Sequence, residues 1–274
     1  MDVDGTVAVI TGGASGIGRA TALELARRGA DVVVADVNGA RIDEVRAEVE
    51  ALGRRYLGVL CDVADDASVA AMRDEALDTM GHVDIVMSNA GVAMIGPPEG
   101  LSMQEWDWIL QINLYGVIRN VRAFIPHLVE RGSGYVVNTA SVAGLYAYSW
   151  DHPAYITAKS GVVGFTESIA LYLKPLGIGV SVLCPSLVAT NIGETARFGG
   201  IDDISRWMAP MPFEEPLDAD AVGPMVADAI RDERYLILTD PAAIRERMAR
   251  RGADLDAFVD AQIAELPPPP KLYP

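Results

Sequence analysis

The sequence predicts an α/β fold in which a parallel sheet lies between two layers of helices. Along the 274 residues, short runs of β-branched residues alternate with longer segments of helical periodicity. The short runs are apolar at nearly every position, which is typical of strands that are buried on both faces. We therefore expect a doubly wound, seven-stranded parallel sheet flanked by helices on both faces.

Seven strands are expected, each rich in Val, Ile or Leu and followed by polar or small residues. In chain order they are 7–11, 31–36, 56–61, 84–88, 135–140, 179–184 and 235–239. After each strand, apolar residues recur at helical spacing. The corresponding helices are expected near 17–28, 40–52, 67–80, 102–131, from Tyr155 to about Leu173, 219–231 and 242–264.

Two segments fall outside this alternation. Residues 186–216 contain Gly, Met and Pro without periodicity, and an irregular segment of this length in a compact domain is usually a functional lid. The tail LPPPPKLYP (266–274) cannot be helical, because proline lacks an amide donor; it either frays or docks on a neighbouring subunit. We expect a single domain over 1–274, with 186–216 as a substrate-binding lid and 241–274 as a C-terminal helix and tail.

Composition excludes several classes of protein. The net charge of −16 argues against binding to nucleic acid or to an anionic membrane surface. No uninterrupted apolar stretch of about 18 residues is present, and the acidic start lacks the features of a signal peptide, so a cytoplasmic location is expected. Cys61 and Cys184 end apolar runs and are interpreted as reduced core thiols, and with three histidines they give no metal-binding spacing.

A glycine-rich turn, TGGASGIG (11–18), follows the first strand. Gly12, Gly16 and Gly18 permit a tight turn and a close approach of a pyrophosphate to main-chain amides, and Ser15 and Ile17 lie between them. Between a first strand and a first helix, this pattern predicts dinucleotide binding.

An acidic residue at the end of the second strand indicates which dinucleotide is bound. The Asp36 carboxylate can accept both hydroxyls of an adenosine ribose and would repel a 2′-phosphate. Its neighbours Val37 and Asn38 carry no positive charge, and Arg19 and Arg41 are interpreted as residues of solvated helix faces. We therefore expect NAD rather than NADP.

Two further strand ends are expected to contact the cofactor, because ligands of open α/β sheets bind at the carboxyl ends of the strands. After the third strand, Asp62 could bind the adenine amino group, with Val63 beside it. After the fourth, Asn89, Ala90 and Gly91 would let the main chain pass close to the cofactor.

The stretch HPAYITAKSG (152–161) places Tyr155 and Lys159 four residues apart, and hence on one face of a helix. Ser141 follows the fifth strand, and Asn113 lies within the long helical region. Together with TGGASGIG, NAG and YITAK, these residues make the chain similar to the short-chain dehydrogenase/reductase family, in the branch with TGxxxGxG and YxxxK motifs. The resemblance covers residues 4–240 and implies a Rossmann-like fold.

The resemblance also implies roles for these residues. Tyr155 would be the general acid/base, its pKa lowered by the Lys159 ammonium and an oxidised nicotinamide. Lys159 would also bind the nicotinamide ribose. Ser141 would bind the substrate oxygen, and Asn113 would hold a water that connects Lys159 to solvent. Further cofactor contacts are implied at Pro185, Val188 and Thr190, of which Thr190 would bind the carboxamide.

The chain departs from the family pattern at three places. Ser88 stands where an Asn is common, and Ser186 replaces the usual Gly after Pro185. Ser141 and Tyr155 are 14 positions apart, one more than we expect, so an insertion must bulge within 145–153 and alter the rim of the substrate site.

The substrate itself is indicated only by class. Bulky side chains in three segments predict an apolar pocket, with Met94, Tyr148, Trp150 and Trp207 as walls and Ser141 on the reacting oxygen. His152 could contact substrate or lie on the surface. We predict an NAD-dependent oxidoreductase that interconverts a hydrophobic, cyclic or aryl, secondary alcohol and its ketone, and the resemblance suggests a homotetramer. A carbonyl reductase using NAD(P)H, a same-fold epimerase or dehydratase, and a redox sensor without turnover stay open as alternatives.

Overall fold

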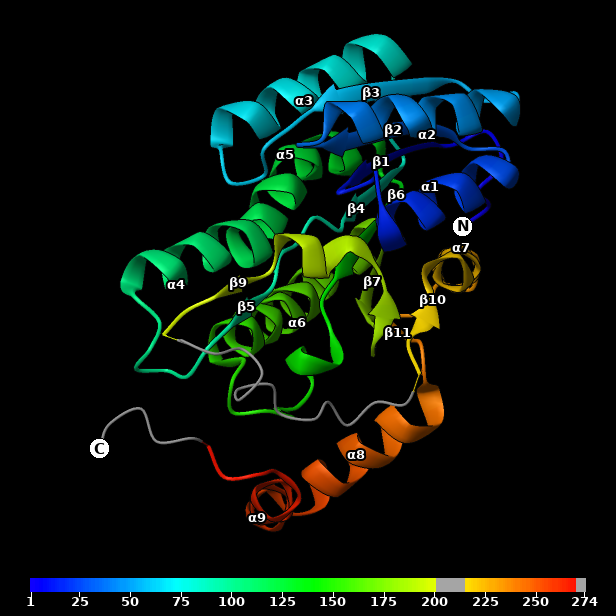
Figure 1. Ribbon diagram of the computed structural model, residues 1–274. Helices are drawn as coiled ribbons and strands as arrows, with labels where there is room; N and C mark the ends of the chain where they lie inside the picture. Colours follow the sequence, from blue (N-terminus) through cyan, green and yellow to red (C-terminus); the bar gives the residue numbers. More distant parts are fainter. Residues whose placement is uncertain (201–214, 270–274) are drawn as a thin grey trace.

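A computed structural model describes residues 1–200 and 215–269. Its centre is a seven-stranded sheet in the order β11-β7-β6-β4-β1-β2-β3, with every neighbouring pair parallel (Figure 1). The strands are β1 (Val7–Thr11), β2 (Asp31–Asp36), β3 (Tyr56–Leu60), β4 (Ile85–Ser88), β6 (Gly134–Thr139), β7 (Ile178–Cys184) and β11 (Leu236–Leu238). The predicted strands and their parallel arrangement are thus confirmed, with bounds that differ by one residue or so at some ends.

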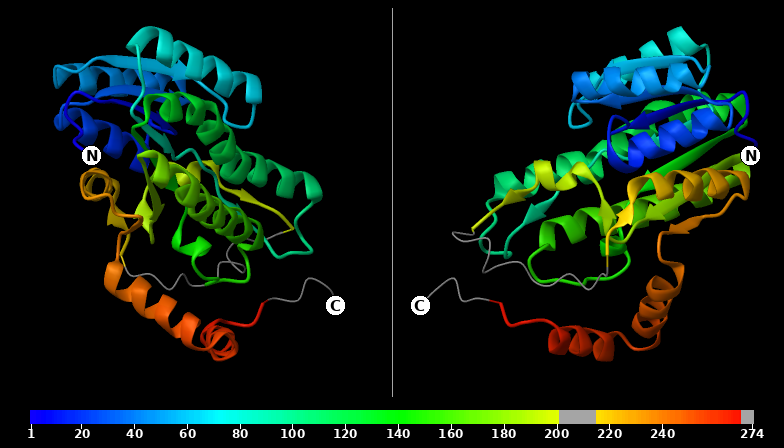
Figure 2. Two further views of the ribbon diagram at one scale, coloured as in Figure 1. Left: turned by 180° about the vertical axis from the view of Figure 1, so that it is seen from behind. Right: turned by 45° about the vertical axis from the view of Figure 1, so that its right-hand side comes forward.

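Helices cover both faces of this sheet (Figures 1 and 2). One face packs against α1 (Gly16–Arg27), α2 (Gly39–Ala51) and α7 (Val222–Arg231), through a core cluster that includes Leu25, Val45 and Ile230. The other face packs against α3 (Asp66–Met80), α5 (Gly116–Arg131) and α6 (Pro153–Leu173), through a cluster that includes Met72, Phe124 and Val162. The two apolar layers are what the buried, non-alternating strands require.

The long helical region predicted at 102–131 is not one regular helix. A capping box between Ser102 and Glu105 starts α4 (Met103–Leu110), and a π-helical segment (Gln111–Tyr115) joins it to α5. A π-helical segment inserts an extra residue into a turn and is often found at functional sites. Here it places the side chain of Asn113 in the protein interior, fully buried.

The single helix predicted at 242–264 is wrong in one respect, because the chain forms two helices there, α8 (Pro241–Ala253) and α9 (Leu255–Glu265). Asp254 between them is extended, with φ −156° and ψ 106°, and its carboxylate accepts a hydrogen bond from the Ala257 amide at 3.0 Å. Asp254 therefore ends one helix and caps the start of the next.

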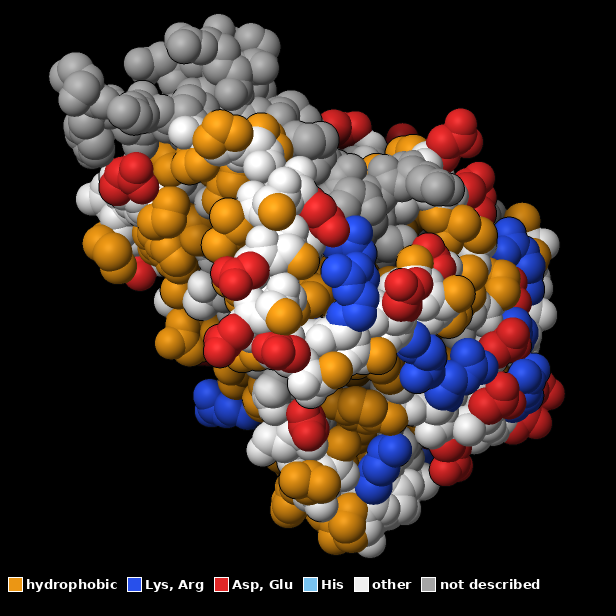
Figure 3. All heavy atoms as spheres, turned by 90° about the horizontal axis from the view of Figure 1, so that it is seen from below, with side chains coloured by type: hydrophobic (Ala, Val, Ile, Leu, Met, Phe, Trp, Pro, Cys, Tyr) orange, Lys and Arg blue, Asp and Glu red, His pale blue; other side chains and the backbone are white. Residues whose placement is uncertain are grey.

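The α8–α9 unit lies beside the loop that precedes α6. Phe258 of α9 is buried, and its ring centre is 6.2 Å from that of Tyr146. The indole of Trp150 donates a hydrogen bond to the Pro267 carbonyl at 3.2 Å. These contacts fix the start of the proline-rich tail against the body; residues 270–274 of the tail lie outside the described part. The α9 side chains Leu255, Val259 and Ile263 are exposed. Seen from below, the surface of the molecule shows hydrophobic and acidic side chains next to one another (Figure 3).

Two small parallel pairings, which the sequence did not predict, involve the segment expected as a lid or the residues directly after it. Strand β8 (Val188–Ala189) pairs with β10 (Leu217–Asp218), and β5 (Met94–Ile95) pairs with β9 (Arg197–Phe198). Residues 201–214 of this segment lie outside the described residues. None of the described helices is long and apolar enough to cross a membrane.

Candidate active site

The glycine-rich turn between β1 and α1 has no room for a side chain at Gly12, Gly16 or Gly18. Gly12 has a φ of +62°, and a Cβ added there would lie 2.7 Å from the Cα of Ala90. A Cβ on Gly18 would lie 2.1 Å from the Gly12 carbonyl oxygen. A Cβ on Gly16, which has a φ of +49°, would lie 3.0 Å from two side-chain carbons of Thr190. These three positions therefore require glycine, because the turn packs tightly against Ala90 and Thr190.

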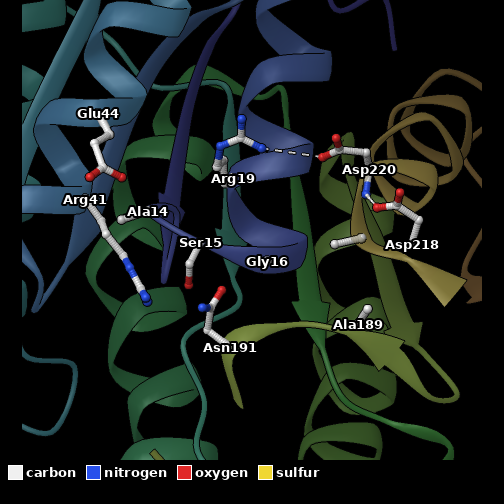
Figure 4. Close-up of a pocket in the computed structure, with 11 residues that line it drawn as sticks. Ala14, Ser15, Gly16, Arg19, Arg41, Glu44, Ala189, Asn191, Asp218 and Asp220 are labelled. Atoms are coloured by element: carbon white, nitrogen blue, oxygen red, sulfur yellow. Dashed lines mark hydrogen bonds and ion pairs between the residues drawn. The ribbon is translucent and has the colours of Figure 1, made fainter. Parts of the chain in front are cut away.

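A pocket of ≈ 340 Å³ opens at this turn (Figure 4). Ser15, Gly16 and Asn191 line it from the turn and from the segment after β8. Arg19 and Arg41 line it too, although they were interpreted as residues of solvated helix faces. Arg19 forms ion pairs with Glu48 and, at 3.5 Å, with Asp220, and Arg41 forms one with Glu194 at 2.9 Å. Carboxylates therefore neutralise both guanidinium groups in the structure.

Asp36 lies at the carboxyl end of β2, beside the same turn. Its carboxylate accepts hydrogen bonds from the main-chain amides of Ala14 at 3.2 Å and of Asn38 at 3.0 Å. The negative charge of Asp36 is thus fixed next to the turn, where the sequence predicts a carboxylate that binds the hydroxyls of the adenosine ribose. The adjacent Val37 side chain is exposed.

Asn89 joins three strand ends. Its amide group donates to the Gly12 carbonyl at 3.1 Å and accepts from the Thr139 hydroxyl at 3.2 Å, and its main-chain N–H donates to the Thr11 hydroxyl at 3.0 Å. This network holds the Ala90–Gly91 segment against the turn. At the next strand end, Asp62 is exposed and accepts from the Ala64 amide at 2.9 Å.

Lys159 is buried at the centre of the carboxyl edge of the sheet. Its ammonium donates a hydrogen bond to the Thr139 carbonyl at 2.9 Å and lies 5.8 Å from the centre of the Tyr155 ring. The two side chains share one face of α6, as their spacing predicts. Burial disfavours the charged ammonium and lowers the pKa of Lys159 to about 8.

Tyr155 is partly buried, and Ser141 is almost fully buried beside it. Burial raises the pKa of the Tyr155 phenol above its usual value, and a hydrogen bond with the Ser141 side chain acts in the opposite direction. The expected lowering is therefore not a property of the chain alone. Ser141 also accepts a hydrogen bond from the Ala143 amide at 3.1 Å, which orients its hydroxyl.

Asn113 binds the main chain of Val92 from both ends of its amide. The Val92 amide donates to its Oδ1 atom at 2.8 Å, and its Nδ2 atom donates to the Val92 carbonyl at 2.8 Å. Gly91 lies between Asn113 and Lys159, because a Cβ added there would lie 3.3 Å from Asn113 Oδ1 and 3.6 Å from Lys159 Nζ. The structure thus brings the four predicted catalytic residues together, with Asn113 and Lys159 on either side of Gly91.

The segment after β7 carries the last of the predicted cofactor contacts. The carbonyl of Pro185, a buried residue, accepts a hydrogen bond from the Val142 amide at 3.0 Å, and Val188 is buried in β8. Thr190 packs against Gly16 and accepts a hydrogen bond from the Ile192 amide at 3.4 Å, so the segment passes over the turn. Ser186, which departs from the family pattern, hydrogen-bonds to the Thr239 hydroxyl at 2.9 Å and joins this loop to the end of β11.

The predicted substrate residues differ in their placement. Met94 is fully buried in a cluster with Leu101 and Ile109, and Tyr148 is buried as well. Trp150 is partly buried, and Trp207 lies outside the described residues. The partly buried side chains that pack on the Met94 cluster beside the site are Val92, Trp106, Trp108 and Tyr155.

Three features of the site had no clear signal in the sequence. The Thr139 carbonyl that binds Lys159 is a main-chain atom, which any residue would provide. The buried thiol of Cys184 lies near Lys159; burial raises its pKa to about 12, although the Ser141 amide and Lys159 act in the opposite direction. The ion pair of Arg41 with Glu194 joins residues 153 positions apart. Among the described residues, no group of three or more His, Cys, Asp or Glu side chains could hold a metal ion.

Comparison with known proteins agrees with this geometry. The family model described as short chain dehydrogenase matches residues 6–198. The D-threitol dehydrogenase of Mycolicibacterium smegmatis is 38% identical over 208 residues, covering 76% of this chain and 80% of that protein. The (2S)-[(R)-hydroxy(phenyl)methyl]succinyl-CoA dehydrogenase subunit BbsD of Thauera aromatica is 37% identical over 190 residues, covering 69% of this chain and 76% of that protein.

A solved structure shares the whole fold. It is that of a short chain dehydrogenase/reductase from Burkholderia phymatum in complex with NAD, with a TM-score of 0.83 and 32% identity, covering 94% of this chain and 96% of that one. Fold, family match and relatives agree: the chain belongs to the short-chain dehydrogenase family, and it is an oxidoreductase of the kind that uses a nicotinamide cofactor and acts on small molecules.

Proposed function

We propose that this protein is an NAD-dependent dehydrogenase that interconverts a hydrophobic, cyclic or aryl, secondary alcohol and its ketone. The observation that carries the proposal is the placement of Tyr155, Ser141 and Lys159 at one end of the sheet, next to the glycine-rich turn. A hydroxyl that can take a proton, a second hydroxyl that can bind an oxygen, and a buried cation are the groups that alcohol oxidation requires.

The described residues fit a dinucleotide. The pocket at the turn is lined by Ser15 and Gly16, where the main chain can approach a pyrophosphate, and the Asp36 carboxylate is fixed beside the turn. A bound nicotinamide supplies the hydride chemistry, which no side chain can provide. The pyrophosphate would be held by the residues of the turn, namely Gly12, Ser15, Gly16, Ile17 and Gly18. The predicted strand-end residues from Asp62 to Thr190 would contact the other parts of the dinucleotide.

In the oxidative direction, the carbinol oxygen would give its proton to the phenolate of Tyr155, and the carbinol hydrogen would leave with its electron pair as hydride, for which a bound oxidised nicotinamide would be the acceptor. Ser141 donates a hydrogen bond to the same oxygen and holds it as the negative charge develops. The electron pair of the broken O–H bond would become the second bond between carbon and oxygen, so that a C=O double bond forms. The step would leave a ketone and a neutral Tyr155, and a bound nicotinamide would carry the hydride.

Lys159 has two roles in this proposal. Its ammonium favours the phenolate of Tyr155, because an opposite charge nearby stabilises the ionised form. Its pKa of about 8 also lets it release a proton near neutral pH. Asn113 lies on the other side of Gly91 and would hold the water through which that proton reaches solvent.

The choice of NAD rests on charge. The Asp36 carboxylate would lie close to a 2′-phosphate, and carboxylates already pair with the two arginines that line the pocket. The solved structure from Burkholderia phymatum contains NAD, which agrees with this proposal.

The choice of an apolar substrate rests on the side chains around Tyr155. Its ring packs against the cluster of Met94, with Trp106 and Trp108 at its edge. The name of the BbsD relative contains a hydroxy(phenyl)methyl group, which is an aryl carbinol. D-threitol, in the name of the other relative, is a polyol without an apolar part, and it belongs in any substrate panel.

Other parts of the proposal concern organisation and direction. Residues 186–216 would close over the substrate as a lid, and the chain would form a cytoplasmic homotetramer. Oxidation is favoured where NAD exceeds NADH, whereas a carbonyl reductase would run the same step in reverse. An epimerase or dehydratase of the same fold would regenerate its cofactor, so stoichiometric accumulation of NADH with product excludes that class.

A panel of alcohols and ketones with NAD and NADH tests the proposal, with Tyr155→Phe as the control. We expect turnover of cyclic or aryl secondary alcohols and a loss of at least about 10²-fold in kcat for Tyr155→Phe, with cofactor binding retained. Turnover of D-threitol and sugars without any turnover of cyclic alcohols would contradict the substrate class. Undiminished turnover by Tyr155→Phe would contradict the mechanism.

A further inference from the structure

The loop before α6 contains a buried carboxylate that the proposed mechanism does not use. Asp151 is 1% exposed. Its Oδ1 atom lies 2.6 Å from Nδ1 of His152 and also accepts a hydrogen bond from the Ser149 hydroxyl. Its carbonyl accepts a hydrogen bond from the Gly96 amide at 2.8 Å, which joins two of the segments predicted to form the substrate wall. A buried carboxylate is stabilised by such partners, and the pair with His152 lies in the loop next to the site.

His152 lies between two tyrosines of the site. Its ring centre is 5.9 Å from that of Tyr148 and 6.5 Å from that of Tyr155, the latter at an interplanar angle of 77°. Only 13% of its side chain is exposed. The residue is therefore not the surface histidine that the sequence left open, and it lies one helical turn before the proposed acid/base.

A capping role does not explain the residue. His152 occupies the N-cap position of α6, yet its side chain makes no capping hydrogen bond. Ser, Thr, Asn or Asp would satisfy the free amides of the first turn, and histidine does not. The side chain is directed instead toward Asp151, Tyr148 and Tyr155.

The contact with Asp151 determines which nitrogen is available. Nδ1 is held by the carboxylate, so it carries the proton in the neutral imidazole and donates to Oδ1. Among hydrogen bonds of the described residues, none involves Nε2 of His152. A neutral ring would accept a hydrogen bond at Nε2, and a protonated ring would donate one. A hydroxyl group can pair with Nε2 in both states, since it is donor and acceptor at once.

We propose that His152 binds a second hydroxyl of the substrate, one or two carbons from the reacting carbinol, and that Asp151 is the positioning residue that orients it. This inference rests on the proposed function and narrows its substrate to an apolar alcohol that is also a diol. Tyr155 and Ser141 hold the reacting oxygen, and His152 reads the neighbouring one. A site built to bind a hydroxyl rejects the analogue that lacks it, because its polar group is left unpaired.

Kinetics with matched substrates test the inference. The probes are 1-phenylethanol, 1-phenylethane-1,2-diol and 1-phenylpropane-1,3-diol, and the measured quantity is the ratio of kcat/KM for a diol to that for the mono-alcohol. We expect one of the two diols to be preferred by about tenfold or more. His152→Asn keeps a donor near Asp151 but lacks the distal nitrogen, so the ratio should fall by about tenfold. His152→Gln places an amide near the Nε2 position, so it should retain part of the preference for the diol. Asp151→Asn should lower the ratio less than His152→Asn does.

A second histidine–carboxylate pair provides the control. His82 Nε2 lies 3.1 Å from Asp84 Oδ2, before β4 and thus at the opposite end of the sheet. His82→Asn should leave the ratio unchanged. A ratio that His152→Asn does not lower would overturn the inference, because a merely structural pair would slow both substrates alike.

Binding without turnover separates this inference from the proposed function. The chain has three histidines, so 15N-histidine spectra can be assigned with His82→Asn and His152→Asn. With NADH present, we expect the preferred diol to shift the Nε2 resonance of His152, and 1-phenylethanol to leave it in place. An unshifted resonance with both diols overturns the inference even where the mono-alcohol is oxidised. A shift in a protein that oxidises none of the probes would support it while the proposed function fails.

Discussion

Lys159 donates its hydrogen bond to the carbonyl oxygen of Thr139, at 2.9 Å, and approaches Tyr155 only to 5.8 Å from the ring centre. The cation is therefore held by the end of β6, on the same side of α6 as the phenol. Because its side chain is almost fully buried, its charge is costly in the folded state, and the stability of the protein should therefore depend on pH.

The first prediction concerns stability. The pKa of Lys159 is lowered from 10.5 to about 8, so the folded state carries the cost in full below pH 8 and loses it as the pH rises to about 10.5. Lys159→Met should therefore be more stable than the parent at pH 7, by up to about 3 kcal/mol, and the difference should shrink between pH 8 and 10. Urea unfolding of both proteins at pH 7, 8 and 10 measures this difference in the free energy of unfolding. A difference that does not depend on pH would show that Lys159 keeps its ordinary pKa.

The second prediction concerns the pH dependence of catalysis. The hydrogen bond from Ser141 lowers the pKa of Tyr155, against the larger effect of burial. Ser141→Ala should therefore move the rising limb of kcat/KM for alcohol oxidation to higher pH, and lower its plateau by about 10²-fold. Ser141→Thr keeps a hydroxyl and should move the limb less. A limb that stays in place in the alanine variant would assign it to another group.

The third prediction concerns the glycine-rich turn. In Gly12→Ala the new Cβ would lie 2.7 Å from main-chain atoms of Ala90, in a backbone conformation with φ +62°. We expect the free energy of unfolding to fall by about 1–3 kcal/mol and the Kd for NADH to rise at least tenfold, as measured by urea unfolding and nucleotide fluorescence. Gly252→Ala is the matched control, since a Cβ there meets no atom within 4 Å. Equal effects of the two substitutions would contradict the assignment of the glycine-rich turn to dinucleotide binding.

The fourth prediction concerns cofactor choice. Asp36→Asn removes the negative charge and keeps one side-chain oxygen, which can accept the amide of Ala14 or of Asn38 but not both. The ratio of kcat/KM with NAD to that with NADP should fall by tenfold or more, because repulsion of the 2′-phosphate is lost. Asp62→Asn should change both values alike, since the adenine is common to the two cofactors. A parent protein that prefers NADP would contradict the assignment of Asp36.

Much of the fold could be predicted because it depends on patterns that one sequence displays. Buried parallel strands must be apolar throughout, and a helical pair four residues apart must share a face, as Tyr155 and Lys159 do. The break at Asp254 had a signal, an acidic residue able to cap a helix, which continuous periodicity on both sides obscured.

Other parts could not be predicted because they depend on contacts between distant segments. The π-helical segment at Asn113 follows from the fit of that side chain to Val92, which no local pattern encodes. The sign of the pKa shift at Tyr155 depends on how deeply the ring is buried, and spacing along a helix does not reveal burial. The surroundings of His152 are likewise set by the loop at 145–152, whose insertion was visible but whose path was not.

The contacts of Phe258 with Tyr146 and of Pro267 with Trp150 have a practical consequence. A fluorophore attached at position 267 would lie near the loop that carries His152, and would report on substrate entry or disturb it. The amino end instead binds the carbonyls of Ile230 and Arg231, which close α7 on the other side of the sheet. Immobilisation through the amino end would therefore leave the catalytic edge unobstructed.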